Sequence, residues 1–281
     1  MKYAVIGDRG MFGQEMSYLL RDKGVDFSGF NRTNIDLDVF TAAELATQLE
    51  EFQVIVNAVA YTAVDKAETE IFEANATNGI VAGKLAQASA LLGARFIHIS
   101  TDYVFDGNGT RPYGVADLVN PQSEYGRSKV LGEKLISESG ADYTIFRTAW
   151  LYGQYGRCFP KVIADVLAKN GSAKVVGDQF GQPTWARDLA EQVFSYSRIG
   201  NSPKIVHAVA SGKASWADFA VEVANSLGLN GKEAIEVIET RDYPTRAKRP
   251  AWSVLDNSSL FVDPIDDWRE RWKLAAEAII R

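Results

Sequence analysis

The chain has 281 residues, of which 46% are hydrophobic and 23% charged, a balance typical of a globular protein with a sizeable core. A net charge of −6 without blocks of like charge argues against a nucleic-acid partner or a membrane-surface helix. Because no apolar run could span a bilayer, no signal peptide is recognisable and Cys158 is the only cysteine, we expect a cytoplasmic protein without disulfides or membrane contact.

Short apolar runs alternate with helical patterns through the first half of the chain. The patterns predict the following elements: strands at 2–6, 25–30, 54–58, 96–100 and 143–147, and helices at 11–21, 41–50, 71–92 and 124–137. Strands alternating with helices of this length indicate a parallel sheet covered on both faces, with right-handed crossovers. We therefore predict an α/β fold, a Rossmann-like doubly wound parallel sheet, with residues 1–150 as its dinucleotide-binding domain.

The alternation of predicted strands and helices becomes less regular after residue 150. The remaining patterns predict helices at 159–169, 185–197 and 214–227, a strand at 204–208, an extended basic segment at 241–250 and a final helix at 264–280. Asp263 is the expected cap of that last helix and Pro264 its first residue. We predict that residues 151–281 form a smaller C-terminal substrate-binding lobe, with segments that return to the sheet of the first domain.

The turn after the first strand carries three regularly spaced glycines. They are Gly7, Gly10 and Gly13, and Met11 and Phe12 begin the helix that follows. Glycines let the backbone approach a pyrophosphate closely, and the helix start supplies free N–H groups and a positive dipole end. A glycine-rich turn without a ligand is the alternative, but its position between a strand and a helix favours a dinucleotide site.

The end of the second strand bears on the choice of cofactor. An NAD site usually has an acidic residue there, but this chain has Arg32, which could bind a 2′-phosphate, so NADP(H) is favoured and NAD(H) remains possible. The alternative for Arg32 is a solvated loop charge. Asp36 could accept the adenine amino group while Leu37 packs on the ring, or Asp36 could simply belong to the turn before the next helix.

Residues after the third and fourth strands should meet at one edge of the sheet, where ligands bind in open α/β folds. After the third strand, Ala58, Ala60 and Tyr61 belong to a run of small residues that would let the cofactor ribose and nicotinamide pass. At the end of the fourth strand, Thr101 is placed to hydrogen-bond a reacting oxygen. A strand that merely ends in Ser and Thr would look the same.

Tyr125 and Lys129 form a Tyr-x-x-x-Lys pair on a predicted helix. Residues four apart share a helix face at about 5–6 Å between Cβ atoms, and a neighbouring ammonium would lower the tyrosine pKa. Such spacing also arises by chance. However, the chain contains only two histidines, His98 and His207, which we expect to be structural, and no zinc-binding motif. Acid–base chemistry must then fall to Tyr, Lys, Asp or Glu.

Taken together, these segments resemble the extended branch of the short-chain dehydrogenase/reductase superfamily, and within it the dTDP-4-dehydrorhamnose reductase family. The resemblance covers nearly the whole chain and is carried by VNA at 56–58, STDYVF at 100–105, YGRSK at 125–129 with GE at 132–133, RTAWLYG at 147–153, DQFGQPT at 178–184 and the segment 246–250. Each piece alone is common, but the combination is specific.

The resemblance implies an NADPH-dependent enzyme that reduces the C4 ketone of a nucleotide-activated deoxysugar, with dTDP-4-dehydro-L-rhamnose as the expected substrate. It implies that Tyr125 donates the proton, that Lys129 binds the nicotinamide ribose and tunes the tyrosine, and that Thr101 assists at the substrate oxygen. The substrate contacts it suggests are Thr101, Asp102, Tyr103, Val104, Trp150, Gln182 and Arg246. It also leaves a homodimer open.

Two alternatives share these motifs. One is a related dTDP- or UDP-sugar 4-ketoreductase that gives another epimer, and the other is a non-catalytic NADP-binding subunit resembling the regulatory subunit of methionine adenosyltransferase. The chain departs from the family at Cys158, where asparagine is frequent, and at Trp252, where a small or polar residue is usual. Some members bind Mg²⁺ through glutamates, but Glu15 has no recognisable partners here, so no metal is predicted.

Overall fold

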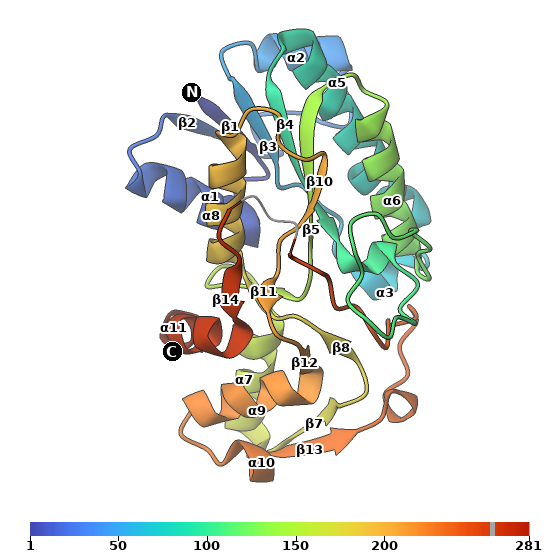
Figure 1. The fold of residues 1–281 in the computed structure, drawn as a ribbon, viewed down its shortest axis with the longest axis vertical. Helices are drawn as coiled ribbons and strands as arrows, with labels where there is room; N and C mark the ends of the chain where they lie inside the picture. Colours follow the sequence, from blue (N-terminus) through green and yellow to red (C-terminus); the bar gives the residue numbers. More distant parts are fainter. Residues whose placement is uncertain (259–261, 281) are drawn as a thin grey trace.

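Six parallel strands form the central sheet of the upper lobe in Figure 1, in a computed structural model that describes residues 1–258 and 262–280. They are β1 (Tyr3–Ile6), β2 (Phe27–Phe30), β3 (Val54–Asn57), β4 (Arg95–Thr101), β5 (Asp142–Thr148) and β10 (Ile205–His207). Their order is β10-β5-β4-β3-β1-β2, and every neighbouring pair is parallel. The predicted return of the second half to the sheet is confirmed by β10.

Helices cover both faces of this sheet. One face carries α1 (Met11–Asp22) and α8 (Ala186–Ser197), and the other carries α2 (Ala42–Gln48), α5 (Ala82–Leu92) and α6 (Glu124–Ser137). Strand residues alternate between the two: Tyr3 and Val5 pack in the α1–α8 core, and Ala4 and Ile6 in the opposite one. Because both faces are covered, every residue of β1 and β3 is buried, and these strands are almost entirely apolar. The predicted doubly wound Rossmann-like fold is confirmed.

The helix predicted at 71–92 has an irregular middle. It consists of α4 (Ile71–Asn75), a π-helical segment η1 (Ala76–Val81) and α5. Within the π turn, Asn78 exchanges hydrogen bonds with the main chain of Tyr61 at 2.8 and 3.0 Å and donates to Ser128 Oγ at 2.9 Å. The irregularity thus lets one buried amide tie together the segment after β3, where the short α3 (Val64–Ala67) begins, and α6.

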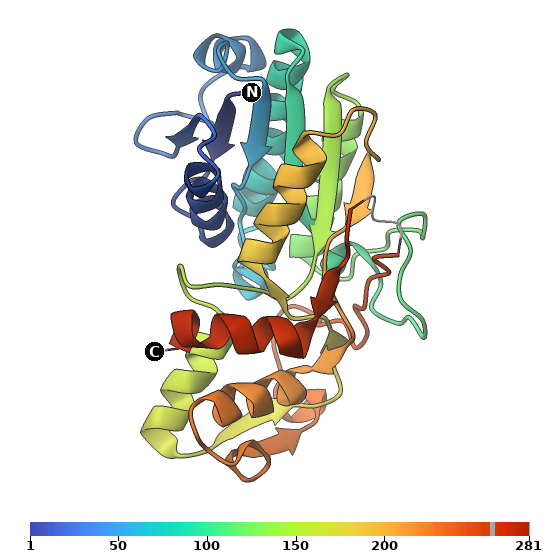
Figure 2. The same cartoon turned by 60° about the vertical axis from the view of Figure 1, so that its left-hand side comes forward.

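In the described residues, the lower lobe contains four helices and several short strand pairs. The helices are α7 (Phe159–Asn170), α9 (Trp216–Ser226), α10 (Gly231–Ala234) and α11 (Trp268–Ile280). The pairs are β7 (Ala173–Val176) with β13 (Ile235–Ile238), β6 (Leu151–Tyr152) with β9 (Thr184–Trp185), β8 (Phe180–Gly181) with β12 (Ala214–Ser215), and β11 (Ala210–Ser211) with β14 (Ile265–Asp267). Figure 2 shows α11, in red, between α9 and the sheet lobe.

The core of this lobe contains a cluster of aromatic side chains, Tyr152, Phe219 and Trp272, among aliphatic residues. The division at residue 150 stays a prediction, since α8 and β10 belong to the sheet lobe although they come from the second half. None of the helices in the described ranges is long and apolar enough to cross a membrane.

The start of the final helix differs from the prediction. Residues 265–267 form β14 beside β11, and α11 begins at Trp268. Asp263 is therefore not the cap. Instead, the Asp267 carboxylate accepts a hydrogen bond from the main-chain N–H of Arg269 at 2.9 Å. The sheet-like pairing with β11 decides the boundary, and it cannot be read from local capping signals. The expected extended segment at 241–250 also differs at its start, where residues 240–242 form a 3₁₀ turn.

Candidate active site

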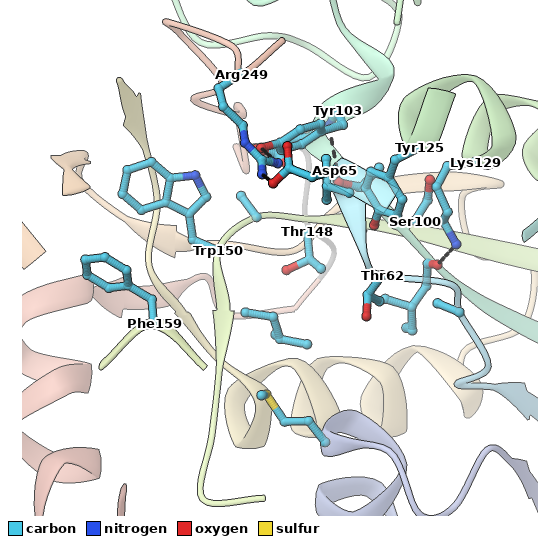
Figure 3. A pocket seen from close by; sticks show the side chains of 18 of the residues that line it. Thr62, Asp65, Ser100, Tyr103, Tyr125, Lys129, Thr148, Trp150, Phe159 and Arg249 are labelled. Carbon is cyan, nitrogen blue, oxygen red and sulfur yellow. Dashed lines mark hydrogen bonds and ion pairs between the residues drawn. The ribbon is translucent and has the colours of Figure 1, made fainter. Parts of the chain in front are cut away.

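A cavity of about 1100 Å³ lies between the carboxyl ends of the sheet and the lower lobe. Its lining comes from the β1–α1 turn, the segments after β3 and β4, α6, the end of β5 and the lower lobe. Ligands of open α/β sheets bind at this edge. Figure 3 shows Tyr125 and Lys129 on one side of the cavity and Trp150 and Phe159 on the other.

The glycine turn is tightly folded against its neighbours. Gly7 has a φ of +91°, in the region that favours glycine, and a Cβ on Gly13 would lie 2.1 Å from the Gly7 carbonyl oxygen. Gly10 is the residue just before α1, whose start has no side-chain cap among the described residues, and Gly10, Met11 and Phe12 line the cavity. An uncapped helix start beside a close backbone turn fits a pyrophosphate, as predicted.

The predicted adenine-side residues lie beyond the cavity lining. Strand β2 pairs with β1 up to Phe30, so Arg32 follows at the same sheet edge as the glycine turn, with its side chain exposed. Asp36 accepts hydrogen bonds from the main-chain N–H groups of Asp38 and Val39 at 3.2 and 3.1 Å. Asp36 therefore stabilises the turn before α2. Leu37 packs against the core on the sheet face that α2, α5 and α6 cover.

The segment after β3 reaches the cavity with only some of its side chains. Ala58 and Ala60 line the cavity, as expected for residues that a cofactor must pass, and so does Thr62. Tyr61 is not part of the lining. Its hydroxyl donates to Glu70, and this bond raises the pKa of Tyr61 to about 12. Tyr61 therefore anchors the segment instead of facing a ligand.

Tyr125 and Lys129 project into the cavity from successive turns of α6. Ser123 caps this helix by accepting from the N–H of Gly126 at 3.1 Å. Burial raises the pKa of Tyr125 above its ordinary value, and a hydrogen bond with Thr101 opposes that rise. The expected lowering of the tyrosine pKa by the lysine is thus wrong for this structure. The phenol stays protonated at neutral pH and can donate its proton.

The physical reason lies in where the lysine points. Lys129 Nζ donates to the Ile99 carbonyl at 2.6 Å and lies 3.0 Å from His98 Nε2, so it contacts β4 instead of the phenol (Figure 3 shows the first contact). Lys129 is 1% exposed, and burial lowers its pKa to about 8 despite the opposing charge of Glu133. His98 is fully buried, and its partner Lys129 is a proposed catalytic residue.

The end of β4 presents a connected polar group. Thr101 Oγ1 donates to Asp102 Oδ1 at 2.9 Å and accepts from the N–H of Tyr103 at 3.2 Å. Burial raises the pKa of Asp102 to about 6, against hydrogen bonds from Ser253 and Thr101 that lower it. Thr101, Asp102 and Tyr103 all line the cavity, as expected. Val104 does not, and that expectation is corrected: its side chain is buried in a separate apolar cluster.

Aromatic rings form the wall on the lower-lobe side. Trp150 has an unusual φ of 44°, and its ring stacks on Trp216 at 3.5 Å between centroids. Phe159 lies against Trp216 in turn, at 4.6 Å. Gln182 is not part of this wall, which corrects the prediction. Its amide donates to the Leu255 carbonyl at 3.1 Å and accepts from the Leu255 N–H at 2.8 Å, so it holds two chain segments together.

The late basic segment sends two arginines to the cavity, Arg246 and Arg249. Arg249 forms an ion pair of 2.5 Å with Asp65 and donates to the Tyr103 hydroxyl at 3.3 Å. Arg241 is exposed and pairs with Glu239 instead. Arg246 was expected to contact the substrate, and its position in the cavity lining agrees with that expectation.

Several lining residues were missed from the sequence. Asp65, Phe159 and Trp216 line the cavity, but no motif or spacing in the sequence singles them out. Thr148 could have been found, since it ends the parallel strand next to β4. Its hydroxyl is buried and has no hydrogen-bond partner among the described residues.

The two family departures and Glu15 lie away from the cavity lining. Glu15 is buried and pairs with Arg187 at 2.8 Å, so an arginine balances its charge. In the described ranges, no group of three or more His, Cys, Asp or Glu residues could hold a metal ion. Cys158 is buried with its thiol 3.6 Å from the Gly153 carbonyl, and Trp252 packs on Phe180.

Comparison with known proteins gives a consistent result. The family model described as RmlD substrate binding domain matches residues 1–280. The dTDP-4-dehydrorhamnose reductase of Burkholderia thailandensis is 36% identical over 96% of this chain and 96% of its own length. A dTDP-4-dehydrorhamnose reductase structure from Clostridium acetobutylicum is 35% identical, with a TM-score of 0.91 over 99% of both chains. Another from Bacillus anthracis, in complex with NADP, is 29% identical, with a TM-score of 0.89 over 98% of both chains.

Proposed function

The chain belongs to the RmlD substrate binding domain family, and on that premise we propose that it is an NADPH-dependent oxidoreductase that reduces dTDP-4-dehydro-L-rhamnose to dTDP-L-rhamnose. The observation that carries the proposal is the convergence of Thr101, Tyr125 and Lys129 on one cavity that also reaches the glycine turn. A protein that only bound NADP would have no need for a buried, protonated phenol beside a buried lysine. The convergence therefore favours an enzyme over a regulatory subunit.

NADPH fits the sheet side of the cavity. The close turn at Gly7 and Gly13 and the uncapped start of α1 would hold its pyrophosphate, and Ala58 and Ala60 leave room for the ribose and the nicotinamide. When bound there, the cofactor supplies the hydride that a ketone carbon needs. Arg32, at the same sheet edge, is the proposed partner of the 2′-phosphate.

The protein supplies the proton and the orientation. Reduction of a ketone places negative charge on its oxygen, and Tyr125 is the group that we propose to donate a proton to it. Burial keeps the phenol protonated at neutral pH, because it raises the tyrosine pKa. Thr101, which hydrogen-bonds with the phenol, would hold the substrate oxygen in line, and Lys129 would bind the nicotinamide ribose.

The nucleotide of the substrate fits the opposite end. Arg246 lines the cavity and would face the diphosphate, while Arg249 is already engaged with Asp65. The stacked rings of Trp150 and Trp216 offer an apolar wall to the sugar or the base. Asp102 and Tyr103 lie between these ends, next to Thr101, where they could contact sugar hydroxyls.

The experiment is a reductase assay with purified protein, NADPH and dTDP-4-dehydro-L-rhamnose, followed by loss of NADPH absorbance and identification of the product. Tyr125→Phe should lower kcat by about 10²- to 10⁴-fold, the usual contribution of a positioned general acid. It should leave the Kd for NADPH nearly unchanged, because the phenol hydroxyl is not a proposed cofactor anchor. No turnover by the wild type, with NADPH bound tightly, would refute the reductase function for this substrate.

Two finer points belong to the same proposal. A related dTDP- or UDP-sugar ketone reduced faster than dTDP-4-dehydro-L-rhamnose would move the substrate assignment and leave the reaction type intact. We also propose that the enzyme acts in the cytoplasm, which the single free cysteine favours, and that it forms a homodimer, as the family resemblance suggests. Light scattering of the purified protein tests the second point directly.

A further inference from the structure

A buried chain of hydrogen-bonding groups leads from the third strand to the proposed catalytic lysine. Asn57 Nδ2 lies 3.0 Å from His98 Nδ1, and His98 Nε2 lies 3.0 Å from Lys129 Nζ. The three side chains come from β3, β4 and α6, and none is more than 1% exposed. No part of the proposed reaction uses Asn57 or His98, and neither lines the cavity, yet His98 contacts the lysine and Asn57 contacts His98.

The direction of the first hydrogen bond is set by the main chain. The N–H of Val59 donates to Asn57 Oδ1 at 3.0 Å, so the amide must turn its Nδ2 toward the histidine. The opposite orientation of the Asn57 amide would place its NH₂ group against the Val59 N–H, two donors facing each other in a buried position. Asn57 therefore donates, and His98 Nδ1 accepts. A neutral imidazole that accepts at Nδ1 carries its proton at Nε2.

The imidazole is neutral at neutral pH and above. Burial lowers the pKa of His98 well below its usual range, and the nearby Lys129 adds to this. Its Nε2–H then points at Lys129 Nζ. An ammonium has donors only and would oppose this N–H, whereas a neutral amine has one lone pair to accept it. The amine still has N–H groups for the Ile99 carbonyl, 2.6 Å away.

We propose that Asn57 and His98 are positioning residues that hold Lys129 as a neutral amine against β4, and that binding of NADPH draws the lysine away from them and makes it take up a proton. The inference rests on the proposed function only in that NADPH is the ligand of Lys129. The step is a simple protonation: the amine lone pair binds one proton from solvent, and nothing is oxidised or reduced.

The other charged groups around the lysine set the pH range. On α6, Glu133 raises the lysine pKa, but its carboxylate is paired at 2.7 Å with Arg147 of β5. Asp102 at the end of β4 has a pKa raised to about 6, so it is charged where the lysine titrates. Burial outweighs Glu133 and lowers the lysine pKa to about 8. Proton uptake on NADPH binding should therefore grow as the pH rises through about 8.

The first test needs no ligand. In ¹⁵N-histidine-labelled protein only two imidazoles are seen, because His98 and His207 are the only histidines, and the spectrum of His98→Gln assigns them. Above a pH of about 8, where the lysine is neutral, His98 should carry its proton at Nε2 and none at Nδ1. An Nδ1–H tautomer of His98 at that pH would overturn the proposal, whatever the protein catalyses.

The second test measures the proton itself. NADPH is titrated calorimetrically into wild-type protein in buffers of different ionisation enthalpy, and uptake should approach one proton above a pH of about 8. The affinity for NADPH should then fall by up to about tenfold per pH unit, the linkage of one proton to one binding event. Tight binding without proton uptake would refute the proposal. No binding at all would instead refute the proposed function, and the histidine spectrum would still decide the inference.

Two variants give Lys129 a hydrogen-bond acceptor in place of the His98 Nε2–H, one by adding a charge and one without a charge. In Asn57→Asp the carboxylate accepts from both Val59 N–H and His98 Nδ1–H, which leaves a lone pair at Nε2 for an ammonium. His98→Gln is uncharged and can offer its carbonyl oxygen to the lysine. Both should abolish most of the proton uptake, and a merely structural role of His98 would not change it. Wild-type uptake in both folded variants would contradict the proposal.

Discussion

Replacing Glu133 by glutamine should destabilise the protein strongly without touching the cavity lining. Glu133 is buried on α6 and accepts three hydrogen bonds: from Ser100 Oγ at 2.6 Å, and from Arg147 Nε and Nη2 at 3.0 and 2.7 Å. Glutamine keeps the shape but removes the negative charge. Arg147, only 4% exposed in its side chain, would remain as a buried cation without its partner.

The magnitude follows from the cost of an unpaired buried charge. Removing one partner of a buried ion pair costs about 3–5 kcal/mol, and because glutamine can still accept one hydrogen bond we expect about 3 kcal/mol. For a chain of this size each kcal/mol lowers the Tm by roughly 2–4 °C, so the expected loss is about 6–12 °C. Thermal unfolding followed by circular dichroism, with denaturant titration as a check, measures both quantities.

Two further variants make the test of Glu133 specific. Glu138→Gln removes a carboxylate from an exposed pair with Lys134 near the end of the same helix and should change stability by no more than about 0.5 kcal/mol. The double variant Glu133→Gln/Arg147→Met removes the stranded cation and should recover part of the loss. A Tm loss as small as that of Glu138→Gln, or a double variant no more stable than Glu133→Gln, would refute the reasoning.

Three further substitutions test the proposed 2′-phosphate partner Arg32, the proposed diphosphate partner Arg246 and the buried carboxyl of Asp102. Arg32→Ala should weaken NADPH binding by about tenfold or more and leave NADH almost unchanged, because a charge-assisted bond to the 2′-phosphate contributes about 1.5–3 kcal/mol; equal effects on both cofactors in fluorescence titrations would show that Arg32 does not bind that phosphate. Arg246→Gln should raise the KM for the sugar nucleotide by about tenfold in steady-state kinetics, with little change in kcat. The matched control is Arg241→Gln, because Arg241 pairs with Glu239 at the surface. An equal rise of KM in the two variants would contradict the role of Arg246. Asp102→Asn should stabilise the fold at neutral pH. Burial raises the folded pKa of Asp102 to about 6, so the wild-type protein loses stability as the pH rises from the ordinary pKa of an aspartate to about 6, and asparagine avoids this loss. A difference in Tm between variant and wild type that does not grow over this pH range would argue against a buried, unfavourably charged Asp102.

The sequence alone was enough to predict the fold class and to predict that Thr101, Tyr125 and Lys129 lie close together, as they do in the cavity lining. The reason is that both depend on local patterns. Apolar runs alternating with helical periods specify a covered parallel sheet, and the order of the chain then places Thr101 and the residues after β3 at one edge. The four-residue spacing of Tyr125 and Lys129 needs only a helix to bring them together. These expectations hold because each involves contacts within one element or between neighbouring strands.

What the tertiary structure alone decided involves partners far apart in the chain. Gln182 was expected to contact substrate, but its amide pairs with Leu255, which no local pattern reveals. The boundary of α11 depends on pairing with β11, and the cavity-lining Arg249 is paired with Asp65, 184 residues away. The pKa of Tyr125 is the clearest case. A nearby lysine lowers a tyrosine pKa only if its charge faces the phenol. Burial and the pull of Ile99 and His98 on Lys129, both set by how β4 packs on α6, reverse that expectation.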